Sequence, residues 1–205
     1  MRHDVRSRCV KAVAASTLVL AALLGATVGG PKDAVPLVGT EGADTLIGTP
    51  QRDLLRSLGG DDELYAGGGA DEVFAGPGED HVYAGDGNDL VWGSNVGDVG
   101  DVEDYRRERL LGGAGNDVLA SNMAGAVLIG GTGYDELHAL ARPRCRIDLA
   151  ARRRVSDEPR CVIWLLGGRG RDRLWAKNGA ADVVVCGRGD VVEGADRIDR
   201  VYPGC

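Results

Sequence analysis

The stretch AGGGADEVFAGPGEDHVYAGDGNDLVW, residues 66–92, decides the fold because it repeats one nine-residue phrase three times. Each copy reads small–Gly–x–Gly–x–Asp–x–Val–aromatic, so an aspartate, a valine and an aromatic residue return at fixed places. Glycine loses more conformational freedom on folding than any other residue. Its regular use here therefore indicates turns of one defined shape rather than ordinary loops.

The same spacing continues on both sides of this stretch. Aspartates at strict intervals of nine are Asp44, Asp53, Asp62, Asp71, Asp80, Asp89 and Asp98. An aliphatic residue stands two positions after most of them. The register returns in GGAGNDVLA (112–120), GGTGYDELH (130–138) and GGRGRDRLW (167–175), which add Asp117, Asp135 and Asp172. Self-similarity at one fixed period is the signature of a repeat protein.

The phrase G-G-x-G-x-D-x-U-x, with U aliphatic, resembles the RTX or haemolysin-type calcium-binding nonapeptide over residues 39–138. The resemblance implies an all-β fold, a right-handed parallel β-roll (a β-helix or solenoid), in which two repeats make one coil. Each repeat would be a six-residue turn followed by a three-residue strand. The resemblance also implies several Ca²⁺ ions, held between turns that are stacked on successive coils.

The chemistry of the residues agrees with that resemblance. Glycines allow positive φ in the turns, and carboxylate and carbonyl oxygens are the ligands that Ca²⁺ prefers. Because side chains alternate along a strand, the aliphatic residue of each short strand points inward. Residues 31–138 carry a net charge of −15, and such a segment repels itself unless cations are present.

If two repeats form a coil, ligands pair at a spacing of eighteen, and we expect two rows of turns. One row is Asp44, Asp62, Asp80 and Asp98, the other is Asp53, Asp71 and Asp89, and Asp117 pairs with Asp135. The predicted metal ligands are these nine residues and Asp172. Glu108 and Ala126 stand at the aspartate position, where we expect weak or absent ion sites. The segment 93–111 is predicted to bulge out as a loop while the roll continues beneath it.

The chain is predicted to divide into five segments. Residues 1–30 have basic residues before an uncharged run from Ala12 to Val28, which favours a Sec-type signal peptide and secretion. Residues 31–38 are a short linker, and 39–138 are the calcium-binding roll. Residues 139–166 are a disulfide-closed basic hairpin or insertion with seven arginines between Arg142 and Arg160. Residues 167–205 are degenerate repeats and a C-terminal cap, with Asp182 and Asp190 as possible degenerate ligands.

Four cysteines remain after removal of the signal: Cys145, Cys161, Cys186 and Cys205. An even number in an exported chain favours two disulfides. Three pairings are possible, and the local pairs Cys145–Cys161 and Cys186–Cys205 are preferred. The C-terminal segment between the last two cysteines resembles the ends of exported actinobacterial calcium-binding repeat proteins, which implies a disulfide-braced cap over the last coil.

The position after the aliphatic residue carries Tyr65, Phe74, Tyr83 and Trp92 in turn. We expect Tyr65 above Tyr83 and Phe74 above Trp92 on the outside of the roll, where they stabilise neighbouring strands or bind a sugar or protein partner.

Calcium ions are the expected partner of a monomeric chain, without nucleic acid or, after signal removal, membrane. The first hypothesis is a secreted protein whose roll folds on Ca²⁺ binding, and not an enzyme, because HExxH and GxSxG are absent. The second is a calcium-dependent adhesion module for a cell surface or polysaccharide. A third, less favoured one is a polysaccharide-active enzyme on a β-helix.

Overall fold

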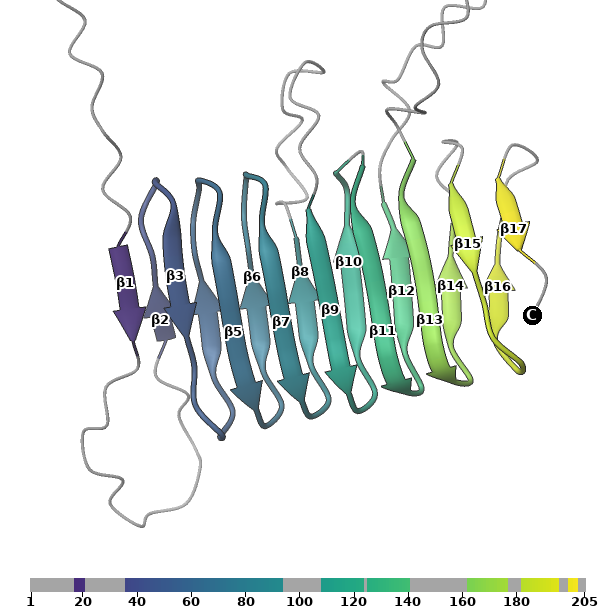
Figure 1. Ribbon diagram of the computed structural model, residues 1–205, viewed down its shortest axis with the longest axis horizontal. Coiled ribbons are helices and arrows are strands. Elements are labelled where there is room, and N and C mark those ends of the chain that lie inside the picture. The colour runs from purple at the N-terminus through teal and green to yellow at the C-terminus, as the bar shows by residue number, and fades with distance from the viewer. Residues whose placement is uncertain are drawn as a thin grey trace, which may run out of the picture.

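The protein folds into a stack of coils in which every described strand is parallel to its neighbours. The structure, a computed structural model, describes residues 17–20, 36–93, 108–123, 125–140, 162–176, 182–195 and 199–202. Within these ranges it contains strands and turns and no helix. The strands form two parallel sheets whose coils follow one another along the long axis of the molecule (Figure 1). The all-β, parallel architecture predicted from the repeats is confirmed.

Odd-numbered strands form one sheet and even-numbered strands form the other, because the chain alternates between the two sheets at each turn. The nine-stranded sheet contains β1 (Thr17–Leu20), β3 (Asp44–Ile47), β5 (Glu63–Gly68), β7 (His81–Asp86), β9 (Arg109–Ala114), β11 (Val127–Gly133), β13 (Trp164–Gly170), β15 (Val183–Val185) and β17 (Arg200–Tyr202). The eight-stranded sheet contains β2 (Pro36–Val38), β4 (Leu54–Arg56), β6 (Glu72–Phe74), β8 (Leu90–Trp92), β10 (Val118–Ser121), β12 (Glu136–Ala139), β14 (Arg173–Trp175) and β16 (Val191–Glu193).

The strand register confirms that two repeats make one coil. Leu46 lies beside Leu64 in the first sheet, and Leu55 lies beside Val73 in the second. Both pairs are eighteen residues apart, so equivalent residues of alternate repeats stack directly on each other. The evenly spaced, slanted hydrogen bonds of parallel strands can then continue from coil to coil.

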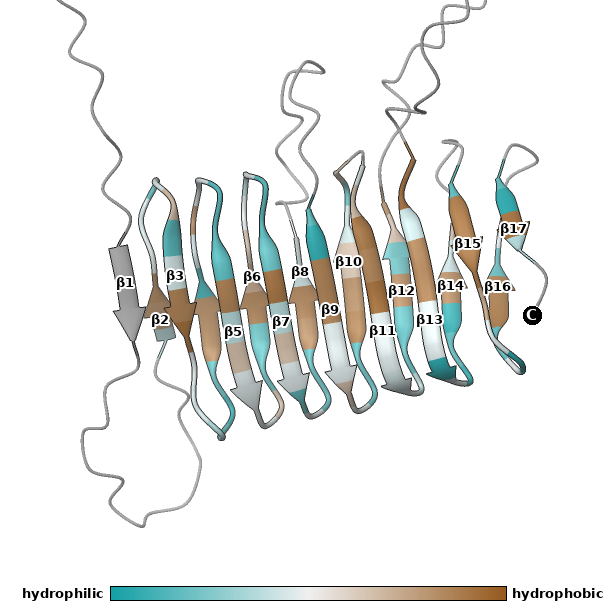
Figure 2. Cartoon of the chain, viewed as in Figure 1, coloured by the Kyte–Doolittle hydropathy of each residue, from teal (hydrophilic) through white to brown (hydrophobic). Residues whose placement is uncertain are grey.

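The core is a thin column of aliphatic side chains enclosed between the two sheets. The fully buried leucines are Leu46, Leu55, Leu64, Leu110, Leu119, Leu128, Leu137, Leu165 and Leu174, each 0% exposed. Val73, Val82 and Val91 occupy the same position in the central coils and are also fully buried. Figure 2 shows hydrophobic residues along the strands and hydrophilic residues at many of the turns between them. The inward orientation predicted for the aliphatic position is confirmed.

The register corrects the predicted pairing of Asp80 with Asp98. Asp98 lies outside the described residues, and Val82 lies beside Leu110 rather than beside a residue eighteen positions later. The position beneath Asp80 therefore belongs to Glu108. This spacing of 28 leaves ten residues more than one coil between β7 and β9, as a bulge requires. The predicted bulge ends earlier than 111, because Glu108 and β9 belong to the roll.

The roll extends beyond its predicted ends. β2 lies in the segment predicted to be a linker, and β13 begins within the segment predicted to be an insertion. β1 falls inside the predicted signal peptide and pairs with β3 at the first edge of the nine-stranded sheet. The other residues of segment 1–30 lie outside the described residues, so the signal peptide stays a prediction. No helix long and apolar enough to cross a membrane occurs in the part of the chain that the structure describes.

Candidate metal site

Two rows of side chains run along the roll, one at the turns before each sheet. Row 1, before the nine-stranded sheet, contains Asp44, Asp62, Asp80, Glu108, Ala126, Ile163, Asp182 and Asp199. Row 2, before the eight-stranded sheet, contains Asp53, Asp71, Asp89, Asp117, Asp135, Asp172 and Asp190. Every aspartate from Asp44 to Asp190 in these rows is buried. The nine-residue period thus brings together predicted ligands that are far apart in the chain.

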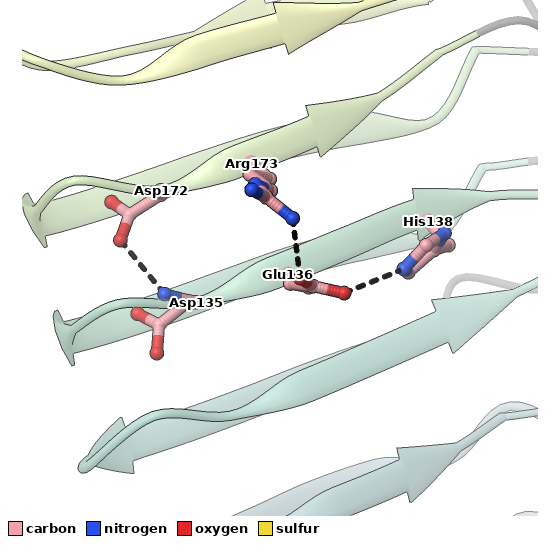
Figure 3. A network of polar contacts seen from close by, with 5 residues as sticks. All are labelled: Asp135, Glu136, His138, Asp172 and Arg173. Atoms are coloured by element: carbon pink, nitrogen blue, oxygen red, sulfur yellow. Dashed lines mark hydrogen bonds and ion pairs between the residues drawn. The ribbon is translucent and has the colours of Figure 1, made fainter.

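From the second member of each row onward, the aspartates link their own coil to the coil before it. In row 2 the backbone N–H of Asp71 donates to Oδ1 of Asp89 at 2.8 Å, and that of Asp135 donates to Oδ1 of Asp172 at 3.0 Å (Figure 3). Row 1 repeats the arrangement, with Asp62 N–H donating to Oδ1 of Asp80 at 3.0 Å. One carboxylate oxygen of each of these aspartates is therefore used to join the coils, whereas Oδ1 of Asp44, at the start of row 1, is buried without a hydrogen bond from the described residues.

The second oxygen of most row aspartates is buried and accepts no hydrogen bond from the described residues. These atoms are Oδ2 of Asp62, Asp71, Asp80, Asp89, Asp117, Asp135 and Asp172. A buried ionised carboxylate without a compensating partner is strongly destabilising. Seven repetitions of the same uncompensated atom indicate that a partner of positive charge completes these turns.

Burial also disfavours the charged form of these carboxyl groups. Desolvation raises the pKa of Asp71 and of Asp117 to about 7, and that of Asp80 to about 8. The pKa of Asp135 rises to about 6 for the same reason. The backbone hydrogen bond that each of them accepts opposes the shift, and neighbouring carboxylates add to it. The rows are thus electrostatically unfavourable at neutral pH without a cation.

The space beside Oδ2 is bordered by backbone oxygens and is kept clear of side chains. A Cβ atom on Gly130 would lie 2.4 Å from Oδ2 of Asp135 and 2.6 Å from the carbonyl oxygen of Gly167, on the next coil. Carboxylate and carbonyl oxygens that converge from two coils match the preference of Ca²⁺ for six to eight oxygen ligands. No group of three or more Asp, Glu, His or Cys side chains with metal-site geometry occurs among the described residues. A cation in the rows would therefore depend on backbone carbonyls as well as carboxylates.

The two rows differ in continuity. Row 2 has an aspartate on seven successive coils, whereas row 1 is interrupted by the apolar residues Ala126 and Ile163, both fully buried. The carboxylate of Glu108 is also fully buried and accepts a hydrogen bond from the Ser121 hydroxyl. Row 1 therefore offers aspartates at its two ends, while its middle contains Glu108, Ala126 and Ile163. The weak or absent sites expected at Glu108 and Ala126 stay a prediction.

The structure adds three members to the rows. Asp190 lies eighteen residues after Asp172, continues row 2 and accepts the N–H of Asp172 at 3.1 Å. Asp182 accepts the N–H of Ile163 at 3.1 Å, and Asp199 accepts that of Asp182 at 2.9 Å. Of the three, only Asp182 breaks the nine-residue spacing counted from Asp172. Asp199 was missed, although it lies nine residues after Asp190 and has the aliphatic Val201 two positions later, and these two signals could have found it.

The outer aromatic residues stack along the roll as predicted. Tyr65 and Tyr83 are parallel, with ring centroids 4.9 Å apart, and Phe74 lies beside Trp92 in the register. His138 stacks on Trp175, with ring centroids 5.7 Å apart, and its Nε2 lies 3.8 Å from the carboxylate of Glu136 (Figure 3). The stacking of Tyr65 on Tyr83 stabilises neighbouring strands, and both side chains remain 37% exposed on the outside of the roll.

The predicted disulfides lie largely outside the described residues. Cys145, Cys161 and Cys205 are not among them, while Cys186 is buried against the last coils. The pairing therefore stays a prediction.

A parallel β-roll with buried carboxylates stacked at its turns defines a class of cation-binding repeat protein. A family model, the RTX calcium-binding nonapeptide repeat, matches residues 38–73, 65–99 and 105–122. The chain carries RTX calcium-binding nonapeptide repeats within residues 38–122, and these repeats imply a calcium-binding repeat protein.

Among solved structures, the extracellular lipase LipA from Serratia marcescens is similar at 16% identity. The similarity covers 78% of this chain and 34% of the lipase, with a TM-score of 0.29. The chain thus spans about a third of the length of that protein. No curated protein matched the chain.

Proposed function

We propose that the protein is secreted through its N-terminal signal and that its roll folds when several Ca²⁺ ions bind outside the cell. The observation that carries this proposal is the repeated Oδ2 atom, buried and without a hydrogen bond from the described residues, at seven aspartates. In the mature chain the segments keep the predicted order of linker, roll, basic hairpin and disulfide-braced cap, and the ligands are the predicted row aspartates whose Oδ2 accepts no hydrogen bond from the described residues.

Calcium would act by replacing the repulsion between stacked carboxylates with the attraction of each carboxylate to a bound ion. When bound, the ion supplies positive charge between two coils, and the protein supplies carboxylate oxygens from the rows and carbonyl oxygens from the turns. In the folded roll the N–H groups of the preceding coil hold these carboxylates by Oδ1, so Oδ2 is oriented toward the turn in which an ion would bind. Extracellular Ca²⁺ modules bind at roughly 10⁻⁴–10⁻³ M. The chain is therefore expected to remain largely unfolded at cytosolic calcium and to fold after export.

A calcium titration of the mature chain, from about residue 35, followed by far-UV circular dichroism, tests the proposal. We expect a cooperative gain of β signal with Ca²⁺ and a much smaller one with Mg²⁺, which requires a tighter octahedral site. Asp71→Ala should move the midpoint to higher calcium, because it removes a ligand and the acceptor for Asp53 N–H. A spectrum that is already fully β-rich in chelator would contradict calcium-dependent folding.

A further inference from the structure

The first two repeats of the roll have a threonine where most later repeats have a glycine. Thr40 and Thr49 occupy the second position of the turns 39–44 and 48–53. In row 2 the same position is glycine in every later described turn of the GGxGxD type. The nonapeptide pattern therefore changes at one end of the stack, at a residue that adjoins the carboxylate.

Each threonine closes its own turn by two hydrogen bonds to the aspartate. Thr40 donates to Oδ2 of Asp44 from its backbone N–H at 2.5 Å and from its hydroxyl at 2.9 Å. Thr49 donates in the same way to Oδ2 of Asp53, at 2.6 and 2.9 Å. Each hydroxyl oxygen also accepts an N–H from its own turn at 3.2 Å, from Gly42 and Gln51 respectively. The carboxylate oxygen that accepts no hydrogen bond from the described residues in the central coils is thus already satisfied here.

The contrast divides the rows into two chemical groups. Oδ2 of Asp53 has two donors, whereas Oδ2 of Asp71, directly beneath it in row 2, has none among the described residues. The far end of row 2 resembles the near end, because Gly187 N–H donates to Oδ2 of Asp190 at 2.7 Å. Charged acceptors are stabilised more strongly by hydrogen bonds than neutral ones. The two hydrogen-bond donors at each of the first two turns therefore supply part of the stabilisation that a cation would give to the carboxylates of later turns.

The position of the threonines follows from the space between coils. Gly67, directly beneath Thr49, has φ +110°, and a Cβ there would lie 2.4 Å from the carbonyl oxygen of Thr49. A β-branched residue cannot occupy that conformation without severe strain. Thr49 does not have a positive φ. A hydroxyl-bearing side chain is therefore compatible with the start of row 2 and incompatible with the coil that follows.

We propose that Thr40 and Thr49 take the place of calcium at Asp44 and Asp53, so that the first two turns of the roll close without an ion. Calcium is then required from Asp62 and Asp71 onward. The calcium-independent turns provide an ordered first coil on which the calcium-dependent coils add. This inference rests on the proposed function for the later turns, but the closure of the first two turns does not depend on it.

The first test compares bound calcium in three full-length chains by equilibrium dialysis with radioactive Ca²⁺. Asp53→Asn keeps an acceptor for Thr49 and should leave the number of bound ions unchanged. Asp71→Asn makes the same substitution one coil later and should lower that number by at least one. If Asp53→Asn removes as many ions as Asp71→Asn, the inference is wrong.

The second test measures hydrogen exchange in chelator, where calcium contributes nothing. Amides 40 and 49 should exchange at least tenfold more slowly, relative to their intrinsic rates, than amides 113 and 131 in the central turns. The double variant Thr40→Val/Thr49→Val should reduce that difference at least threefold, because it removes the hydroxyl bonds and keeps the backbone N–H, and Thr40→Ser/Thr49→Ser should keep it, since serine retains the hydroxyl. Equal exchange in the wild type at all four amides would overturn the closure. A wild-type chain that binds no calcium would refute the proposed function, whereas hydroxyl-dependent protection of amides 40 and 49 would still support the threonine closure.

Discussion

Replacing Asp117 by Asn should have opposite effects on the roll with and without calcium. Asn keeps an oxygen that can accept the N–H of Asp89, which donates to Oδ1 of Asp117 at 2.9 Å. It replaces Oδ2 by an NH₂ group, in a space bordered by the Gly130 carbonyl oxygen. The substitution therefore preserves the link between coils while it removes the buried charge.

The magnitude follows from the pKa of the carboxyl group that is removed. Burial raises the pKa of Asp117 from 3.8 to about 7, a shift that corresponds to roughly 4 kcal/mol between the two protonation states. Screening by water at the turn reduces this, and we expect Asp117→Asn to stabilise the calcium-free roll by about 1–2 kcal/mol at pH 8. With calcium, the loss of a carboxylate ligand should raise the calcium midpoint several-fold.

The assay is the folded fraction by far-UV circular dichroism at pH 8, in EDTA and across a calcium titration. Asp86→Asn is the matched control, because Asp86 is exposed at a turn of the preceding coil and carries the same charge. That control should change both quantities little. If Asp117→Asn destabilises the roll in EDTA as well as in calcium, Oδ2 has a structural role and the reasoning about uncompensated charge is refuted.

Three further predictions concern pH, the core and the surface. In EDTA the roll should be most stable below pH 4 and should lose stability as pH rises through 6–8. The reason is that the folded state, in which the pKa values of Asp135, Asp71, Asp117 and Asp80 are raised, retains protons that the unfolded chain releases near 3.8. Saturating calcium should remove this pH dependence, and a pH-independent dichroism signal in EDTA would contradict the prediction. Leu137→Ala removes a fully buried side chain that lies between Leu119 and Leu174. In calcium it should lower the free energy of unfolding, measured by urea denaturation, by about 2–5 kcal/mol. The control Val191→Ala, at a half-exposed position, should lower it by less than about 1 kcal/mol. Glu136→Gln removes the exposed ion pair between Glu136 and Arg173, whose charged atoms lie 3.4 Å apart (Figure 3). It should change the urea midpoint by an amount equivalent to less than about 1 kcal/mol. A larger loss would show that this surface pair contributes more to stability than its exposure suggests.

The nine-residue period, together with the parallel coils of two repeats that the family resemblance implies, was sufficient to predict the inward leucines and the stacking of Tyr65 on Tyr83. These features depend on which side of a coil a residue occupies, and a period of nine with two repeats per coil determines that directly. The same reasoning correctly placed Asp71 above Asp89 and Asp117 above Asp135. It needed no knowledge of distant parts of the chain.

The tertiary structure decided which coil a residue belongs to once the period is broken. Glu108 rather than Asp98 lies beneath Asp80, and Asp172 lies beneath Asp135 although 37 residues separate them. Strand pairing selects the register that buries the next leucine and satisfies the next backbone N–H, and the length of chain between two strands has little influence on that choice. The threonine closure of Asp53 has the same origin, because the stacking of coils leaves room for a side chain at Thr49 and removes it at Gly67, directly beneath.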